Sequence, residues 1–159
     1  MVLPEAEYDR SLPRKRVAAG VLFFDDQDRV LLVDPIYKDP WEIPGGAVEA
    51  DESPKAGARR EVKEELGLDV QPGRLLAIDW APPRPGRSES TAYIFDGGHL
   101  TTEQHTAIQL QADELRAYKY VAADELDERL LPVLARRVRA SAQACRQGTT
   151  LYLENGQSA

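Results

Sequence analysis

Apolar residues occur in short runs separated by polar turns, a pattern that predicts a mixture of strands and helices. Residues 17–24 are apolar and partly β-branched or aromatic, so we expect a buried strand there. The polar residues 25–28 predict a turn, and residues 30–33 predict a second strand that forms a hairpin with the first. Other short apolar runs predict further strands or extended segments: residues 41–43, 75–80, 91–95, 108–110 and 118–121.

The clearest helical pattern covers residues 54–66. Apolar residues recur there at every fourth position and predict one buried stripe, formed by Ala58, Val62 and Leu66. Ser53 is a favourable N-cap, and Pro54 stands at the first helical position. Gly67 predicts the C-terminal end of the helix.

The last third of the chain predicts a short helix near residues 124–129 and a final helix over residues 132–146. Leu134, Val138 and Ala142 mark the apolar face of the final helix. Strands and helices do not alternate regularly along the chain. This order predicts an α/β fold of the α/β/α type around a mixed sheet, rather than a doubly wound parallel sheet.

The chain has 159 residues, of which 42% are hydrophobic and 30% charged, and this composition is typical of one globular domain. Residues 1–13 are polar and contain Pro4 and Pro13, so we expect a flexible N-terminal arm. We assign residues 14–147 to the domain and residues 148–159 to a C-terminal tail.

Charge and cysteine content exclude several classes of protein. The net charge of −7 argues against a protein that binds the nucleic-acid backbone. No apolar run approaches the roughly 18 residues that a membrane span requires. The acidic N-terminal residues contain no long apolar segment of the kind found in a signal peptide, so we expect a cytoplasmic location. The single cysteine, Cys145, predicts neither a disulfide framework nor a thiolate metal site.

Candidate chemistry is concentrated on the helix predicted over residues 54–66. Glu61, Glu64 and Glu65 lie three and four positions apart, so they share one helix face. Like charges at this spacing repel by a few tenths of a kcal/mol per pair. Arg60, four positions before Glu64, offsets part of this repulsion. A hard divalent cation such as Mg²⁺ would offset far more, because it prefers oxygen ligands and is shared between carboxylates and phosphates.

Two glycines precede this helix. Gly45 and Gly46 allow the backbone to approach a ligand closely, with a carbonyl that is free to bind a metal. Taken alone, each feature has an ordinary structural explanation, namely a turn and a solvated charged helix face.

The full spacing of residues 46–68 resembles the Nudix box, G-x5-E-x7-R-E-U-x-E-E-x-G-U, in which U is a bulky aliphatic residue. Every defined position of the pattern matches. The preceding residues 41–46, WEIPGG, resemble the corresponding segment of MutT-type members. The order of strands and loops extends the resemblance over most of residues 14–147.

The resemblance implies a Nudix-type α/β/α sandwich that hydrolyses a nucleoside diphosphate linked to another group. Nucleoside triphosphates, ADP-ribose and nucleotide sugars are substrates of this type. Mg²⁺, or Mn²⁺ in its place, would neutralise the charge that develops on phosphoryl oxygens. The resemblance also implies that the substrate is a small molecule of nucleotide type. Enzymes of this family with short chains are often homodimers.

Roles for individual residues follow from the same resemblance. The implied metal ligands are Glu61, Glu64, Glu65 and the carbonyl oxygen of Gly45. Arg60 would orient the carboxylates. Glu61 or a carboxylate outside the box would activate water; for the latter, Glu114 is favoured over Glu103. Glu52 would be either a secondary ligand or a structural partner.

Residues that select the substrate are harder to recognise. Pro83 lies fifteen positions beyond the box, a spacing found in ADP-ribose-type members, whereas residues 129–132 lack the asparagine of members that act on 8-oxo-guanine nucleotides. Either phosphate contacts or solvation would explain Arg84 and Arg87, and either base stacking or core packing would explain the large aromatics Tyr37, Trp41 and Trp80. We expect His99 and His105 to be solvated.

Two hypotheses compete with hydrolysis. The chain could be a non-catalytic Nudix-fold module that senses a nucleotide, although the carboxylates of the box are intact. It could also be a protein-interaction domain with an acidic helix, which the spacing of the box makes improbable. Replacement of Glu64 or Glu65 by Gln separates the three hypotheses.

Overall fold

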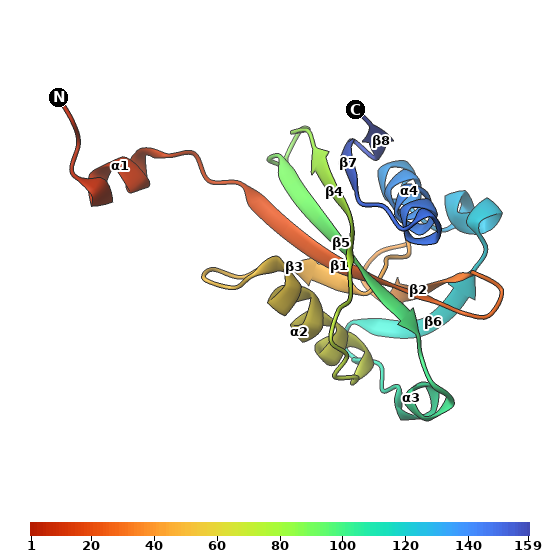
Figure 1. Cartoon of the computed structure of the whole chain (residues 1–159). Coiled ribbons are helices and arrows are strands. Elements are labelled where there is room, and N and C mark those ends of the chain that lie inside the picture. Colours follow the sequence, from red (N-terminus) through yellow and green to blue (C-terminus); the bar gives the residue numbers. More distant parts are fainter.

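One mixed sheet organises the chain, and the computed structural model describes all residues 1–159 (Figure 1). The strands are β1 (Arg16–Phe24), β2 (Val30–Pro35), β3 (Gly45–Ala47), β4 (Leu75–Ala81), β5 (Ser90–His99), β6 (Leu115–Val121), β7 (Leu151–Glu154) and β8 (Gln157–Ser158). Their order is β6-β2-β1-β5-β4-β7-β8, and β3 pairs with β1 outside this path. The β1–β5 and β4–β7 pairs are parallel and the other pairs antiparallel, so the sheet is mixed as predicted.

Helices cover both faces of the sheet (Figure 1). The helices of the chain are α1 (Glu5–Ser11), which lies away from the sheet, α2 (Pro54–Leu66), α3 (Thr102–Ala107), the 3-10 helix η1 (Ala123–Glu128) and α4 (Pro132–Gln147). Alternate residues of β1 separate two hydrophobic clusters, because successive side chains of a strand point to opposite faces. Phe23 packs in the cluster that contains Val62 of α2, whereas Leu22 packs in the cluster that contains Val138 of α4. This arrangement confirms the predicted α/β/α sandwich.

Helix α2 has the bounds that the sequence predicts. The side chain of Ser53 accepts a hydrogen bond of 3.1 Å from the backbone N–H of Ala56. Gly67 ends the helix in the left-handed conformation, with φ of 70°. The local signals for this helix are therefore confirmed in the structure.

Three local features differ from the sequence analysis. Gly45 and Gly46 belong to β3, which pairs with β1, and do not form a simple turn. Residues 108–110 form no strand; the N–H of Gln109 instead donates 2.9 Å to the carbonyl oxygen of Leu66, which satisfies the C-terminal end of α2. The sequence analysis also missed α3, which is closed by a capping box between Thr101 and Gln104.

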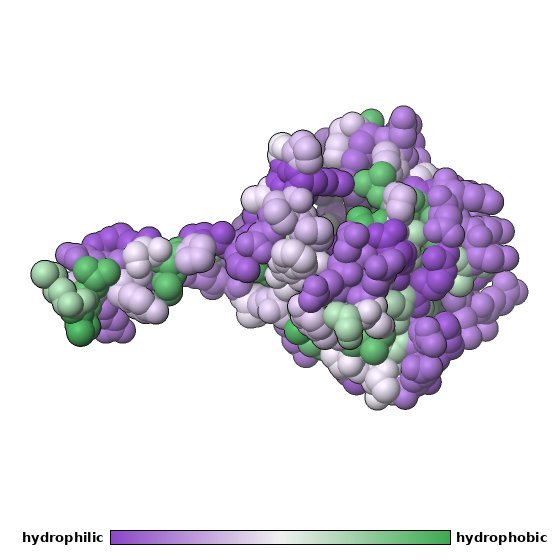
Figure 2. All heavy atoms as spheres, turned by 90° about the horizontal axis from the view of Figure 1, so that it is seen from above, coloured by the Kyte–Doolittle hydropathy of each residue, from purple (hydrophilic) through white to green (hydrophobic).

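The two ends of the chain differ in their contacts. Helix α1 has no buried residue, and Figure 2 shows the N-terminal segment extending away from the rest of the protein. Residues 148–159, expected as a tail, instead contain β7, which pairs with β4, and Leu153 is fully buried. A four-residue strand with one inward-facing leucine carries too little periodicity to be recognised in the sequence. None of the helices is long and apolar enough to cross a lipid bilayer.

Candidate active site

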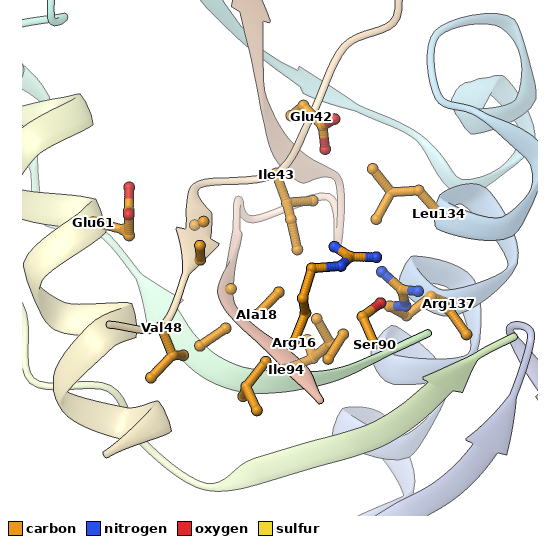
Figure 3. Close-up of a pocket in the computed structure, with 18 of the residues that line it drawn as sticks. Arg16, Ala18, Glu42, Ile43, Val48, Glu61, Ser90, Ile94, Leu134 and Arg137 are labelled. Carbon is orange, nitrogen blue, oxygen red and sulfur yellow. The ribbon is translucent and has the colours of Figure 1, made fainter. Parts of the chain in front are cut away.

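A cavity of about 1020 Å³ lies beside the N-terminal half of β1 and reaches from α2 to α4. Figure 3 shows Glu61 of α2 on one side of this cavity and Leu134 and Arg137 of α4 on the other. Ala18 and Ile94, from the paired strands β1 and β5, line the space between them. The cavity therefore connects the carboxylate helix with the opposite layer of the sandwich.

Glu65 is the most buried of the candidate carboxylates, with 6% of its surface exposed. Its Oε1 accepts a hydrogen bond of 2.9 Å from the backbone N–H of Gly45. Burial, together with repulsion from Glu61 and Glu114, raises the pKa of Glu65 to about 8. A carboxyl group with a raised pKa that lines a cavity is a candidate for a functional role.

The two glycines of β3 create the space for this arrangement. A Cβ atom on Gly45 would lie 2.4 Å from the carbonyl oxygen of Ala19, and Gly45 has a φ of 152°. A Cβ atom on Gly46 would lie 2.6 Å from the carboxyl carbon of Glu61. The β1 backbone therefore requires glycine at position 45, whereas a side chain at position 46 would displace the Glu61 carboxylate.

Arg60 connects the acidic residues of the box. Its Nε and Nη2 donate to the two carboxylate oxygens of Glu52, at 2.8 and 3.0 Å. Its Nη1 donates to Glu61 at 3.0 Å and to Glu64 at 3.3 Å. Nη2 also donates to the carbonyl oxygen of Ala47 at 3.0 Å. Arg60 thus contacts three carboxylates of the box, and its bidentate contact is with Glu52.

Of the other predicted site residues, some line the cavity and some lie outside it. Glu114 lines the cavity, and its charge adds to burial, the main cause, in raising the pKa of both Glu61 and Glu65. The side chain of Glu64 is 49% exposed and lies outside the cavity lining, although it shares Arg60 with Glu61. Glu103 lies on α3 and is also outside the lining. The structure therefore brings Glu61, Glu65 and Glu114 to one cavity.

Glu61 and Glu65 offer oxygen donors of the kind that Mg²⁺ prefers. Protein side chains alone do not form a complete metal site, because no group of three His, Cys, Asp or Glu side chains in the structure is arranged to hold a metal ion. Mg²⁺ commonly takes one or two protein carboxylates and completes its shell with water and substrate phosphates. The chemistry of the donors therefore fits a metal that is held jointly by the protein and a phosphorylated substrate.

The proposed substrate contacts are only partly at the cavity. Tyr37, Pro83, Arg84 and Arg87 line it, whereas Trp41 and Trp80 do not. Trp41 packs against the core, and the Arg129 guanidinium lies over its ring, 4.9 Å from the ring centre. The indole N–H of Trp80 donates a hydrogen bond of 2.6 Å to Glu89. The two histidines also lie outside the lining. His99 contacts a backbone carbonyl and His105 contacts Tyr120.

Sequence reasoning missed the half of the cavity that lies towards α4. Arg16, Ser90 and Arg137 line this half, and Figure 3 shows all three side chains there. Arg137 is anchored by an ion pair of 2.6 Å with Asp79, whose side chain is fully buried. These residues belong to β1, β5 and α4, and no local motif connects them.

Two features define the class of protein. One is the mixed sheet between two helix layers, and the other is the Nudix box on α2, whose carboxylates lie at the cavity. The NUDIX domain family model matches residues 14–142. The chain belongs to this family, and the predicted family is confirmed.

Individual relatives agree with this assignment. Diphosphoinositol polyphosphate phosphohydrolase 2 of Rattus norvegicus is 46% identical over 72 residues, which are 45% of this chain and 40% of that protein. The chain thus matches less than half the length of this relative. The MutT protein of Methanosarcina mazei Go1 has a TM-score of 0.65 and 25% identity, covering 87% of this chain and 99% of that one. An ADP-ribose pyrophosphatase of Streptococcus suis has a TM-score of 0.66 and 25% identity, covering 89% and 99%.

Proposed function

We propose that the protein hydrolyses a pyrophosphate bond in a nucleoside diphosphate that is linked to another group, with Mg²⁺ or Mn²⁺ as the cofactor. The observation that carries this proposal is the position of Glu61 and Glu65, which enter one cavity from α2 while Gly45 and Arg60 fix their orientation. Two like charges held in a partly buried site are unfavourable unless a cation or a proton compensates them. A divalent cation shared with a pyrophosphate supplies that compensation.

The residues have distinct roles in this proposal. Glu61, Glu65 and the carbonyl oxygen of Gly45 would hold the metal from within the cavity, and Glu64 would be a further ligand from the exposed side of α2. The bound metal would neutralise charge on the phosphoryl oxygens. Glu61 or Glu114 accepts a proton from the attacking water, whose oxygen forms a bond to phosphorus as the anhydride bond breaks. Arg60 is a positioning residue, because its donors are directed at Glu52, Glu61 and Glu64.

The named relatives support hydrolysis of a phosphoanhydride. One is a diphosphoinositol polyphosphate phosphohydrolase and another is an ADP-ribose pyrophosphatase. Both names describe the cleavage of bonds between phosphoryl groups. The class of bond is therefore better supported than the identity of the attached group.

The test is phosphate release from a panel of substrates, with and without Mg²⁺, after coupling with pyrophosphatase or phosphatase. The panel contains deoxynucleoside triphosphates, 8-oxo-dGTP, ADP-ribose, nucleotide sugars, dinucleoside polyphosphates and a diphosphoinositol polyphosphate. We expect Mg²⁺-dependent turnover of at least one member and its loss in Glu65→Gln. Ligand-induced shifts of the melting temperature without turnover of any member would contradict the proposal and favour a nucleotide sensor.

A further inference from the structure

The two ends of the cavity are lined by residues of opposite charge. Glu61, Glu65 and Glu114 line the end next to α2. The end next to the β4–β5 loop and α4 contains Arg16, Arg84, Arg87 and Arg137, and the carboxylate of Glu42, which also lines the cavity, pairs with Lys38. The whole chain carries a net charge of −7, so this group of cations runs against the overall charge. With a divalent cation bound to the carboxylates, a cavity with this lining would suit a ligand that is anionic at both ends.

Arg137 is fixed at the basic end by a buried partner. Its Nε donates 2.6 Å to Oδ2 of Asp79, and Oδ1 of Asp79 accepts 3.0 Å from the N–H of Gly156. The Arg137 side chain is 14% exposed, whereas that of Asp79 is fully buried. The Nη groups of Arg137 make no hydrogen bond to the protein, so their donors remain available on the cavity side.

Arg16 supplies a second guanidinium to the same place. It donates from Nε to the hydroxyl of Ser88 at 2.9 Å and from Nη2 to the carbonyl oxygen of Ser88, and it has no carboxylate partner. Figure 3 shows the guanidinium groups of Arg16 and Arg137 pointing into the same part of the cavity. Like charges that face one another repel, and an anion between them reverses the sign of the interaction.

An apolar stretch separates the two charged ends. Ala18, Ile43 and Ile94 line it (Figure 3). The neighbouring Gly20 has no room for a side chain, because a Cβ atom would lie 2.7 Å from Cδ1 of Ile43. The basic residues and the carboxylate cluster thus line different parts of one cavity, with apolar side chains between them.

We propose that the substrate carries a further phosphate group, separate from the pyrophosphate that is cleaved, and that Arg16 and Arg137 bind this phosphate. The inference rests on the proposed function, because it assigns the cleaved pyrophosphate to the end of the cavity next to α2. A guanidinium matches the geometry of phosphate oxygens and donates two parallel hydrogen bonds to them. Arg137 is preorganised for this contact by Asp79.

The test compares ligands that differ by one phosphate. ADP-ribose is paired with ADP-ribose 2′-phosphate, and dephospho-coenzyme A with coenzyme A. Titration calorimetry with Mg²⁺ uses the full chain carrying Glu65→Gln, so that the ligands are not consumed. We expect the phosphate-bearing member of at least one pair to bind about tenfold more tightly or better, the size expected for a charged hydrogen bond.

Variants assign the preference to the subsite. Arg16→Gln should abolish the preference while leaving the other member of the pair unchanged. Arg137→Lys, which retains the charge beside Asp79 but loses the planar fork, should reduce it. Arg139→Gln is the matched control, since Arg139 lies on the same helix, outside the cavity, and pairs with the exposed Asp127.

Two results would overturn the inference. One is equal binding within both pairs, and the other is an equal loss for both members in Arg16→Gln. Turnover in the substrate panel without any preference for the added phosphate would remove this inference and leave the proposed function in place. A preference without metal-dependent turnover would remove the proposed function and leave Arg16 and Arg137 as a phosphate site in a protein that binds its ligand without hydrolysing it.

Discussion

The backbone N–H of Gly45 donates a hydrogen bond of 2.9 Å to the carboxylate of Glu65, and so connects β3 to α2. The adjacent Gly46 lies against the carboxylate of Glu61, without room for a Cβ atom. A short strand and a helix therefore fix two carboxylates together, and this relationship explains why both glycines precede the helix.

The two glycines should respond differently to substitution. Gly45→Ala introduces a Cβ atom 2.4 Å from a backbone oxygen at a φ of 152°, so we expect a lower melting temperature and loss of soluble protein. Gly46→Ala meets the flexible end of the Glu61 side chain, so we expect a near-normal melting temperature. Its turnover should fall by roughly 100-fold, because Glu61 is displaced. Calorimetric melting and a turnover assay distinguish the two effects, and normal turnover in Gly46→Ala would contradict the role of Glu61.

Substitution of Arg60 should lower activity even when the positive charge is kept, because the planar guanidinium is lost. Arg60→Lys cannot hold Glu52 bidentately while also contacting Glu61, so we expect kcat to fall by about tenfold or more. Arg59→Lys is the matched control, because Arg59 is adjacent on α2 and pairs with the exposed Asp69. Steady-state kinetics measure both variants, and equal kcat values for the two would rule out the positioning role.

The stability of the metal-free chain should depend on pH through Glu65. Its folded pKa of about 8 lies above the ordinary value of 4.5, so the folded state binds more protons than the unfolded state between these values. The free energy of unfolding should therefore fall as pH rises from about 5 to about 8. Urea denaturation in EDTA at these two pH values measures the slope.

Two variants check the assignment of this slope. Glu65→Gln should flatten the pH dependence, because its side chain does not titrate. Glu64→Gln, on the exposed side of the same helix, should retain the dependence. A slope that persists in Glu65→Gln would assign the titration to another group. Mg²⁺ should oppose the effect in the wild type, since metal binding favours the ionised carboxylate.

The C-terminal strand should contribute to folding. Leu153 is fully buried between the sheet and α4, so Leu153→Ala should lower the free energy of unfolding by roughly 2–5 kcal/mol. The adjacent Tyr152 is 57% exposed, and Tyr152→Ala should cost much less. Chemical denaturation of both variants makes the comparison. Equal losses would show that β7 does not pack as described.

The sequence by itself determined α2, its two ends and the family, because these depend on interactions between residues close in the chain. A capping serine, a terminal glycine and a four-residue apolar repeat each act within a few turns of one helix. The spacing of Glu61 and Glu65 also fixes their common helix face without reference to any other element. The hairpin of β1 and β2 was predictable for the same reason.

Only the tertiary structure decided which residues complete the cavity. Gly45 and Gly46 form a strand because β1 offers them partners, and residues 148–159 join the sheet because β4 has an open edge. Arg16 and Arg137 meet because β1 and α4 border the same cavity. Such contacts depend on pairing between distant segments, which leaves no periodic signal in either segment. For this reason the sequence predicted the carboxylate end of the site, and the fold alone revealed the basic end.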